Sequence, residues 1–283
     1  MTENKKISAK MQKIYMELGI QQGLFFYEKD YAGKNRLLYK MELKEVFGQS
    51  VSTFELHASE WLQHQMILYD CLEEKNIFTR EMIGNKIKHF DVENFFQGEE
   101  NVLIKLAVIV YHLISKLEDT AENMIWISVM MNNYLREESL STKYYNAYAK
   151  NIVKKKQRIK DILQKTEKNS DLITWIEIFL GILLEGIQRT NEIIKNMILI
   201  NREVDDIICK EKTKDTLSDV MFFIEKYPVF AIRDIENELG ISYNTAAKNV
   251  AILEKQNIVC EISQKQRYRL YMYRRYMEEL IDS

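Results

Sequence analysis

The succession of short apolar segments in the last 68 residues, 216–283, limits the fold of this chain more than any other feature. Apolar residues recur at helical spacing from Leu217 to Lys226, which predicts a helix. Tyr227-Pro228 then ends this helix, because proline has no amide donor and restricts the backbone of its predecessor. The chain must therefore turn at this point.

Two further short helices are predicted after the turn. The first covers 232–239 and ends at Gly240, and the second covers 243–256 with Ser242 as its N-cap. Two helices joined by such a short turn are typical of a helix-turn-helix.

Two strands are predicted beyond these helices, over 258–262 and 267–273, because both segments alternate or run apolar. Residues 263–266 join them into a small β-hairpin, the wing. The sequence therefore predicts a winged helix-turn-helix domain over 216–283.

A winged helix makes nucleic acid the first partner to consider. In such domains the third helix enters the major groove, and its exposed face meets base edges and phosphates. The wing and the residues after it add contacts to the flanking backbone. The residues predicted to bind nucleic acid are Tyr243, Asn244, Lys248, Lys265, Arg267 and Arg269, with Lys255, Arg274 and Arg275 as further candidates.

The charge of this segment is balanced rather than basic. Residues 216–283 contain nine Lys and Arg against ten Asp and Glu, so a phosphate-binding surface must come from segregation of charge. A winged helix can also act only as a packing or dimerisation module, which leaves a protein partner open beside DNA. A homodimer is open as well, since winged helices that read DNA often act in pairs on two half-sites.

Composition indicates a mostly helical globular protein of about two domains. The chain has 283 residues, 46% of them hydrophobic, with nine glycines and one proline. Its net charge of -2 argues against a general polyanion binder. Three cysteines, Cys71, Cys209 and Cys260, have no metal-ligand spacing and are predicted to be free thiols, buried as small hydrophobic residues.

No signal peptide or membrane span is predicted. The N-terminus has no apolar stretch behind its charges, which favours the cytoplasm, where thiols stay reduced. The strongest apolar runs, 102–117 and 124–131, are too short or too interrupted to span a bilayer. They are interpreted as core helices.

The rest of the chain is predicted to form two helical parts, an N-terminal region over 1–97 and a core over 98–209. Within the core, helices over 101–116 and 122–137 are apolar nearly all round, so other helices must enclose them. A long helix begins at Leu172, capped by Ser170-Asp171, and continues with interruptions towards Asp206. A charged connector, 210–216, leads into the C-terminal domain.

A basic stretch, 143–168, separates the apolar helices from the long helix. It holds many lysines against only Asp161 and Glu167. A solvated helix face is favoured over a polyanion site, with Ile152, Val153, Ile159, Ile162 and Leu163 turned inward.

From Leu103 onward the chain resembles bacterial Fic family proteins that carry a C-terminal winged helix. The resemblance rests on Tyr144-Tyr145, on 172–180 (LITWIEIFL) and on 240–254 (GISYNTAAKNVAILE), which occur in the family's order. It implies a Fic-like helical bundle ahead of the winged helix. In the family, a loop His-Pro-Phe-x-Asp-Gly-Asn-Gly-Arg transfers AMP to protein hydroxyls.

The position of that loop is occupied here by 115–123 (SKLEDTAEN), in which only Asp119 is retained. Ser115 stands where the family has its histidine base, and Asn123 stands where it has the phosphate-binding arginine. No glycine lies between Gly98 and Gly181 to form an anion nest. The resemblance therefore implies a degenerate loop in which no residue is assigned a catalytic role.

A histidine, a group of carboxylates and a segment near the N-terminus are further candidates for a functional role. His112 shares a helix face with Ser115, but a partly buried structural histidine is favoured over a displaced base. Glu118, Asp119 and Glu122 are better explained as a capped helix start than as a cation site. Residues 51–56 (VSTFEL) keep only the glutamate of the family's inhibitory segment.

The favoured hypothesis is a catalytically inactive, Fic-like regulatory or signalling protein, whose winged helix binds DNA or a partner and which needs no cofactor. The alternative is a nucleotidyl transferase that uses ATP and magnesium through the altered loop, with Asp119 as the residue to test. The sequence does not identify a DNA site, a sensed ligand or a target protein.

Overall fold

The computed structural model of the chain describes residues 3–27, 100–118, 120–140, 148, 152, 155–169, 172–263 and 269–282. These residues are mostly helical, with one small three-stranded antiparallel sheet. They divide into two compact units, the first up to Asn191 and the second from Glu192.

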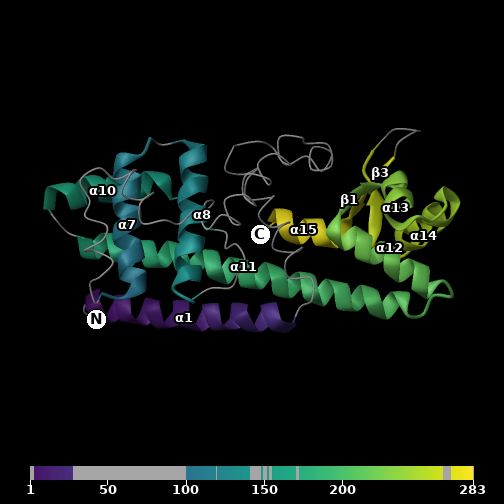
Figure 1. Ribbon diagram of the computed structural model, residues 1–283, viewed down its shortest axis with the longest axis horizontal. Helices are drawn as coiled ribbons and strands as arrows, with labels where there is room; N and C mark the ends of the chain where they lie inside the picture. The colour runs from purple at the N-terminus through teal and green to yellow at the C-terminus, as the bar shows by residue number, and fades with distance from the viewer. Residues whose placement is uncertain are drawn as a thin grey trace. The chain divides into compact units, whose positions relative to one another are not determined.

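The elements described in the N-terminal unit are helices (Figure 1). Its elements are α1 (Glu3–Tyr27), α7 (Val102–Lys116), α8 (Ala121–Glu137), α10 (Lys156–Asn169) and the first half of α11 (Leu172–Ile208). The prediction of apolar helices at the positions of α7 and α8 is confirmed to within a residue. Side chains cap both helices, Asn101 accepting from the amide of Leu103 and Thr120 from the amide of Asn123.

The core of this unit forms around α7, as its apolar sequence requires. Leu103, Leu106 and Leu113 are fully buried there, and α11 contributes the fully buried Trp175. The indole N–H of Trp175 donates to the carbonyl oxygen of Ala107 at 2.7 Å, so the one polar atom of this side chain is satisfied inside the core.

Polar contacts also fasten α1 to α11. Lys10 Nζ donates to the carbonyl oxygen of Glu177 at 2.8 Å, and Asn191 Nδ2 donates to the carbonyl oxygen of Glu17 at 2.9 Å. The two contacts lie near opposite ends of the apolar face that α1 buries with Ile14 and Leu18.

The long helix differs from its prediction because α11 is continuous from Leu172 to Ile208. The predicted interruptions are wrong. The polar residues in its middle are hydrogen-bonded. Thr190 Oγ1 donates to the carbonyl oxygen of Gly186 at 2.9 Å, within the helix, and Asn191 Nδ2 donates to the carbonyl oxygen of Glu17 in α1. The predicted connector over 210–216 is also too long, because α12 (Lys214–Lys226) begins inside it.

The basic stretch follows the solvated-face interpretation where it is described. Ile159, Ile162 and Leu163 of α10 are buried, whereas Arg158 and Lys160 are exposed. Lys155, just before α10, forms an ion pair with Glu185 of α11. Val153 and residues 143–147 lie outside the described residues.

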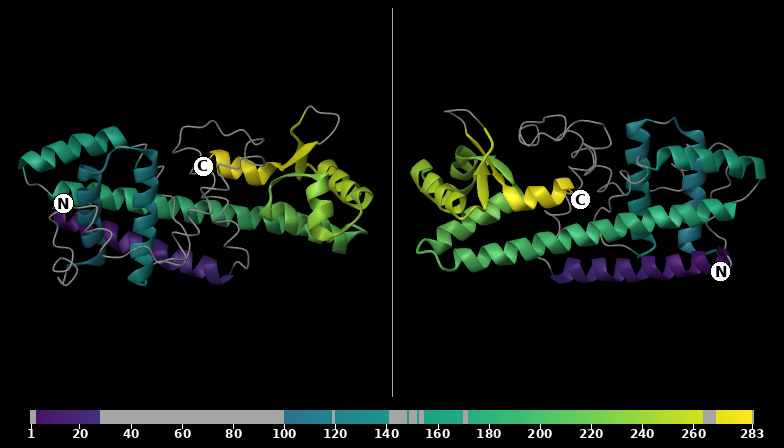
Figure 2. Two further views of the ribbon diagram at one scale, coloured as in Figure 1. Left: turned by 45° about the horizontal axis from the view of Figure 1, so that its top comes forward. Right: turned by 180° about the vertical axis from the view of Figure 1, so that it is seen from behind.

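The C-terminal unit combines helices with the sheet (Figure 2). After the second half of α11 its elements are α12, β1 (Val229–Ala231), α13 (Ile232–Leu239), α14 (Tyr243–Lys255), β2 (Val259–Glu261), β3 (Leu270–Tyr273) and α15 (Arg274–Asp282). The strand order is β1-β3-β2, with β3 antiparallel to both neighbours. Tyr271 of β3 faces Phe230 on one side and Glu261 on the other.

The three helices predicted for this unit are confirmed, α13 with the predicted limits and α14 one residue shorter. The strands β2 and β3 are shorter than predicted, and residues 264–268 of the predicted hairpin lie outside the described residues. The strand β1 was not predicted, because three residues that run directly into a helix are too few to show alternation. Nor was α15, which follows the predicted hairpin and to which no element was assigned.

The described cysteines, Cys209 and Cys260, are free as predicted. Their predicted burial is wrong, because Cys209 is exposed in the turn after α11 and Cys260 is partly exposed on the short strand β2. None of the helices in the described ranges combines the length and the apolar character that a bilayer crossing requires.

Gly240 closes α13 in the left-handed region, with φ at 64°. A β-carbon would meet open space there, so substitution acts through backbone strain alone. We expect Gly240→Ala to lower the free energy of unfolding of the C-terminal unit by about 1–2 kcal/mol. Chemical denaturation followed by circular dichroism measures it.

Gly19→Ala is the matched control for this prediction, because Gly19 lies inside α1 with nothing within 4 Å of an added β-carbon. Gly19→Ala should raise the free energy of unfolding by about 0.5–1 kcal/mol, since alanine is a better helix former than glycine. If both substitutions changed the free energy of unfolding in the same direction, the left-handed backbone assigned to Gly240 would be contradicted.

Candidate nucleic-acid interface

The helix α14 is positioned by a short turn and by its apolar inner face. After Gly240 the chain crosses to Ser242, whose Oγ accepts a hydrogen bond from the amide of Thr245 at 3.2 Å and so caps the helix. Ala246, Val250 and Leu253 are buried against the rest of the unit. This packing fixes which side of α14 faces the solvent.

The exposed side of α14 carries a polar and basic line. Asn244, Lys248, Ala251 and Lys255 are all exposed, and their spacing of four, three and four residues places them on one face. Tyr243 lies at the start of the helix with 47% of its surface exposed. Over this length α14 rises about 16 Å, at 1.5 Å per residue.

The two asparagines of α14 differ in their bonding. The Asn249 side chain is buried and donates to the carbonyl oxygen of Thr245 at 3.0 Å, which is a structural role within the helix. Asn244 is exposed, and no hydrogen bond of its amide occurs within the described ranges. Its donor and its acceptor are therefore both available to a ligand.

Several other basic groups of this unit form ion pairs at the protein surface. Lys226 pairs with Glu238 at 3.8 Å, Arg269 with Glu261 at 3.4 Å and Arg275 with Glu203 at 2.6 Å. By contrast, Lys248 and Lys255 take part in no ion pair within the part of the chain that the structure describes. Among the described residues, the lysines on the outer face of α14 therefore have no ion-pair partner.

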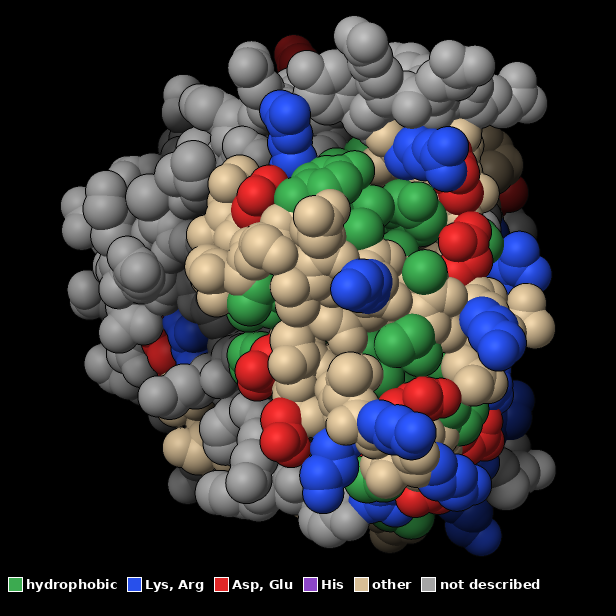
Figure 3. Space-filling model, turned by 90° about the vertical axis from the view of Figure 1, so that its right-hand side faces the viewer, with side chains coloured by type: hydrophobic (Ala, Val, Ile, Leu, Met, Phe, Trp, Pro, Cys, Tyr) green, Lys and Arg blue, Asp and Glu red, His purple; other side chains and the backbone are tan. Residues whose placement is uncertain are grey.

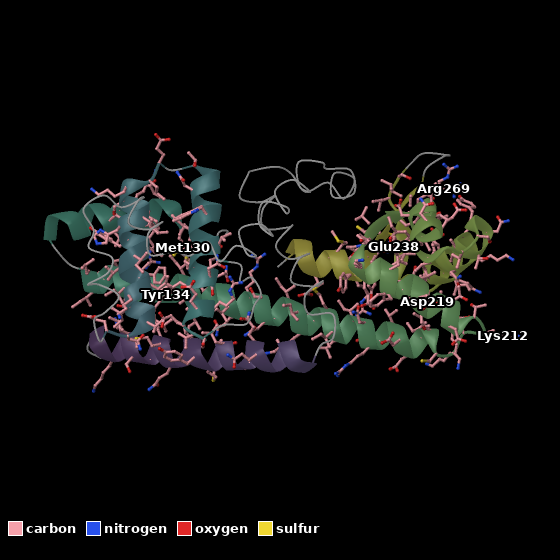
Figure 4. The ribbon with its side chains drawn as sticks, viewed as in Figure 1. Met130, Tyr134, Lys212, Asp219, Glu238 and Arg269 are labelled. Atoms are coloured by element: carbon pink, nitrogen blue, oxygen red, sulfur yellow. The ribbon has the colours of Figure 1, made fainter. Side chains whose placement is uncertain are left out.

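Arg269 was predicted to bind nucleic acid, and its surroundings are mixed. It is exposed at the foot of β3, where Figure 4 labels it, but a hydrogen bond with Tyr271 and the carboxylate of Glu261 raise its pKa. Part of its charge is therefore balanced within the sheet. The two other predicted wing residues, Lys265 and Arg267, lie outside the described residues.

Charged side chains of both signs share the face of the protein drawn in Figure 3. Lys and Arg side chains gather towards its lower edge, with Asp and Glu side chains among them, and apolar groups lie between. On this face the two signs of charge are therefore mixed rather than segregated.

The described residues of 115–123 lie at the end of α7 and the start of α8. Asn123 sits in the first turn of α8, where its Nδ2 donates to the carbonyl oxygen of Glu118 at 2.8 Å. Ser115 is partly buried in the last turn of α7, and its Oγ has no hydrogen-bond partner among the described residues. Asp119 lies outside those residues.

His112 agrees with the interpretation of a partly buried histidine. Its ring lies edge-on to Tyr111, with the ring centroids 5.3 Å apart. Burial, and secondly the charge of Lys116, lower its pKa below 6.5. The described ranges contain no group of three or more His, Cys, Asp or Glu side chains that could hold a metal ion, and the side chains of Asp119 and Glu122 fall outside them.

Sequence reasoning missed the acidic partners that neutralise the arginines of this unit. Glu203 lies 72 residues before Arg275 and belongs to α11, so no local pattern connects the two residues. Glu261 of β2 is in register with Tyr271 of β3, so its ion pair with Arg269, just before β3, runs diagonally between the two antiparallel strands. Cross-strand spacing was the one signal that could have indicated this second pair.

Comparison with known proteins adds no relative to this description. No protein-family model matches the chain, and a search of curated proteins finds no significantly similar sequence.

The lowered pKa of His112 predicts a pH dependence of stability. The folded state binds fewer protons than the unfolded state between the lowered pKa and 6.5, so the free energy of unfolding falls as the pH drops through this window. His112→Gln removes this contribution. Between about pH 7.5 and pH 5.5, the wild-type protein should lose more stability than the variant in urea denaturation.

The other three histidines are present in both proteins, so the comparison isolates His112. Equal losses of stability over this pH range would show that the folded protein does not lower the pKa of His112.

Proposed function

We propose that the C-terminal unit is a winged helix that binds duplex DNA through α14, and that the whole chain acts as a regulatory protein. The order of elements supports this assignment: α12, β1, α13, α14, β2 and β3 follow one another as in a winged helix-turn-helix. The helices α13 and α14, joined by 240–242, form the proposed helix-turn-helix, and α14 is its recognition helix.

The observation that carries the proposal is the uncompensated outer face of α14. Its lysines are exposed and unpaired within the described ranges, whereas nearby arginines are held by carboxylates. Lysine ammonium groups suit phosphate oxygens, and an exposed asparagine amide can bond both N6 and N7 of adenine in the major groove. Asn244 therefore reads bases in this proposal, and Lys248 and Lys255 contact phosphates.

Duplex binding by the full chain should weaken steeply with salt. For a mixed-sequence duplex at low ionic strength, Lys248→Ala combined with Lys255→Ala should reduce the slope of log K against log salt by about two, since each lost phosphate contact removes about 0.9. Fluorescence anisotropy across a salt series measures the slope.

Lys226→Ala is the matched control, because Lys226 is an exposed lysine of the same unit that is already paired with Glu238. It should leave the slope unchanged. Binding that ignores both salt and the double substitution would overturn the DNA proposal and favour a packing or dimerisation role for the unit.

For the N-terminal unit we propose a Fic-like bundle that has lost catalysis. Three features of the chain support this: no glycine between Gly98 and Gly181 is available for an anion nest, Ser115 replaces an imidazole, and Asn123 offers no positive charge. Asn123 is also engaged in capping α8.

We therefore expect no transfer of label when the purified protein is incubated with magnesium and ATP labelled on the α-phosphate, with or without cell lysate. Autoradiography of the separated proteins measures transfer. Label that appears with the wild-type protein and disappears in Asp119→Ala would replace this proposal with the alternative, a nucleotidyl transferase acting on protein hydroxyls through the altered loop.

A further inference from the structure

The turn between α11 and α12 lies against the end of the proposed recognition helix. Gln256, the residue after α14, donates from Nε2 to the carboxylate of Glu211 at 3.3 Å. These residues are 45 positions apart in the sequence. The hydrogen bond therefore places an element that precedes the proposed winged helix next to the C-terminal end of α14.

The same turn is basic and exposed. Lys210, Lys212 and Lys214 are all exposed, and none of them takes part in an ion pair within the described ranges. Figure 4 shows Lys212 pointing away from the protein at this turn. The nearby acidic groups are Asp215 and Glu211, and the carboxylate of Glu211 is occupied in part by Gln256.

Lysines without an ion-pair partner in the described ranges lie on both sides of this contact, with Glu211, Asp215 and Glu254 among them. They are Lys210 and Lys212 of the turn, Lys214 at the start of α12, and Lys248 and Lys255 of α14. Lys255 directly precedes Gln256, the residue that bonds to the turn. The basic surface thus continues past the C-terminal end of α14 rather than stopping there.

The geometry of duplex DNA indicates that the lysines beyond the C-terminal end of α14 bind backbone phosphates. The major groove is about 12 Å wide, whereas α14 is about 20 Å long, so an end of the helix that crosses the groove reaches the phosphates of the flanking strand. Lysines at that end meet phosphate oxygens, which position the protein without reading sequence.

We infer that the α11–α12 turn is a second DNA contact, in which Lys210 and Lys212 bind backbone phosphates beside the C-terminal end of α14. This inference rests on the proposed DNA binding of α14. It extends the DNA-binding surface beyond the winged helix itself to the end of the long helix α11, and the hydrogen bond between Glu211 and Gln256 lies where the turn and α14 meet.

The test is the salt dependence of binding by the full chain to a mixed-sequence duplex. Lys210→Ala combined with Lys212→Ala should reduce the slope of log K against log salt by about two, through the loss of two phosphate contacts. Lys210→Arg with Lys212→Arg keeps both charges and should retain the wild-type slope. Fluorescence anisotropy provides the readout, and circular dichroism checks folding.

Lys195→Ala is the matched control, because Lys195 is another exposed, unpaired lysine of the same unit, about 22 Å of helix before the turn. It should leave the slope unchanged. A slope that the turn variant does not lower, or lowers no more than Lys195→Ala does, overturns the inference.

The two proposals fail separately. If alanine at Lys248 and Lys255 lowers the slope and alanine at Lys210 and Lys212 does not, the proposed DNA binding by α14 is supported and the second contact is contradicted. If the wild-type chain binds no duplex even at low salt, the proposed function falls, and the inference falls with it.

Discussion

Burial of the apolar face of α11 is the constraint on which both units depend. Trp175, Phe179 and Leu183 of its first half belong to the core around α7, and Ile193, Met197 and Val204 of its second half belong to the core with the sheet. One uninterrupted helix therefore supplies apolar surface to two cores. Its polar middle is tolerated because Thr190 and Asn191 find partners within the N-terminal unit.

The second half of α11 also anchors the C-terminal end of the chain. Asn201 accepts from the hydroxyl of Tyr273 at 3.3 Å, and Asn196 donates to Glu279 at 2.8 Å. These bonds join β3 and α15 to α11 within the C-terminal unit. The proposed DNA-binding surface is built on this frame, since the packing of α14 decides which of its residues face solvent.

Local signals predicted the helices of the C-terminal unit well. Pro228 follows the end of α12, Gly240 ends α13, and Ser242 caps the start of α14. The local signals are a missing amide donor, a left-handed backbone and a side-chain acceptor. Apolar periodicity likewise predicted α7 and α8. The failures were elements with weak local patterns, such as the three-residue strand β1 and the short helix α15, both of which depend on packing against distant residues.

The sequence by itself determined the limits of α7, α8, α13 and α14 to within a residue, and which residues of α14 are polar and basic, because capping and periodicity act over a few residues. Only the tertiary structure decided which of the described charged side chains form ion pairs and which do not. Glu203 and Glu261 neutralise Arg275 and Arg269, while Gln256 brings the turn at Glu211 beside α14. Such pairings join residues far apart in the chain or across a sheet, and a count of charges along the sequence cannot anticipate them.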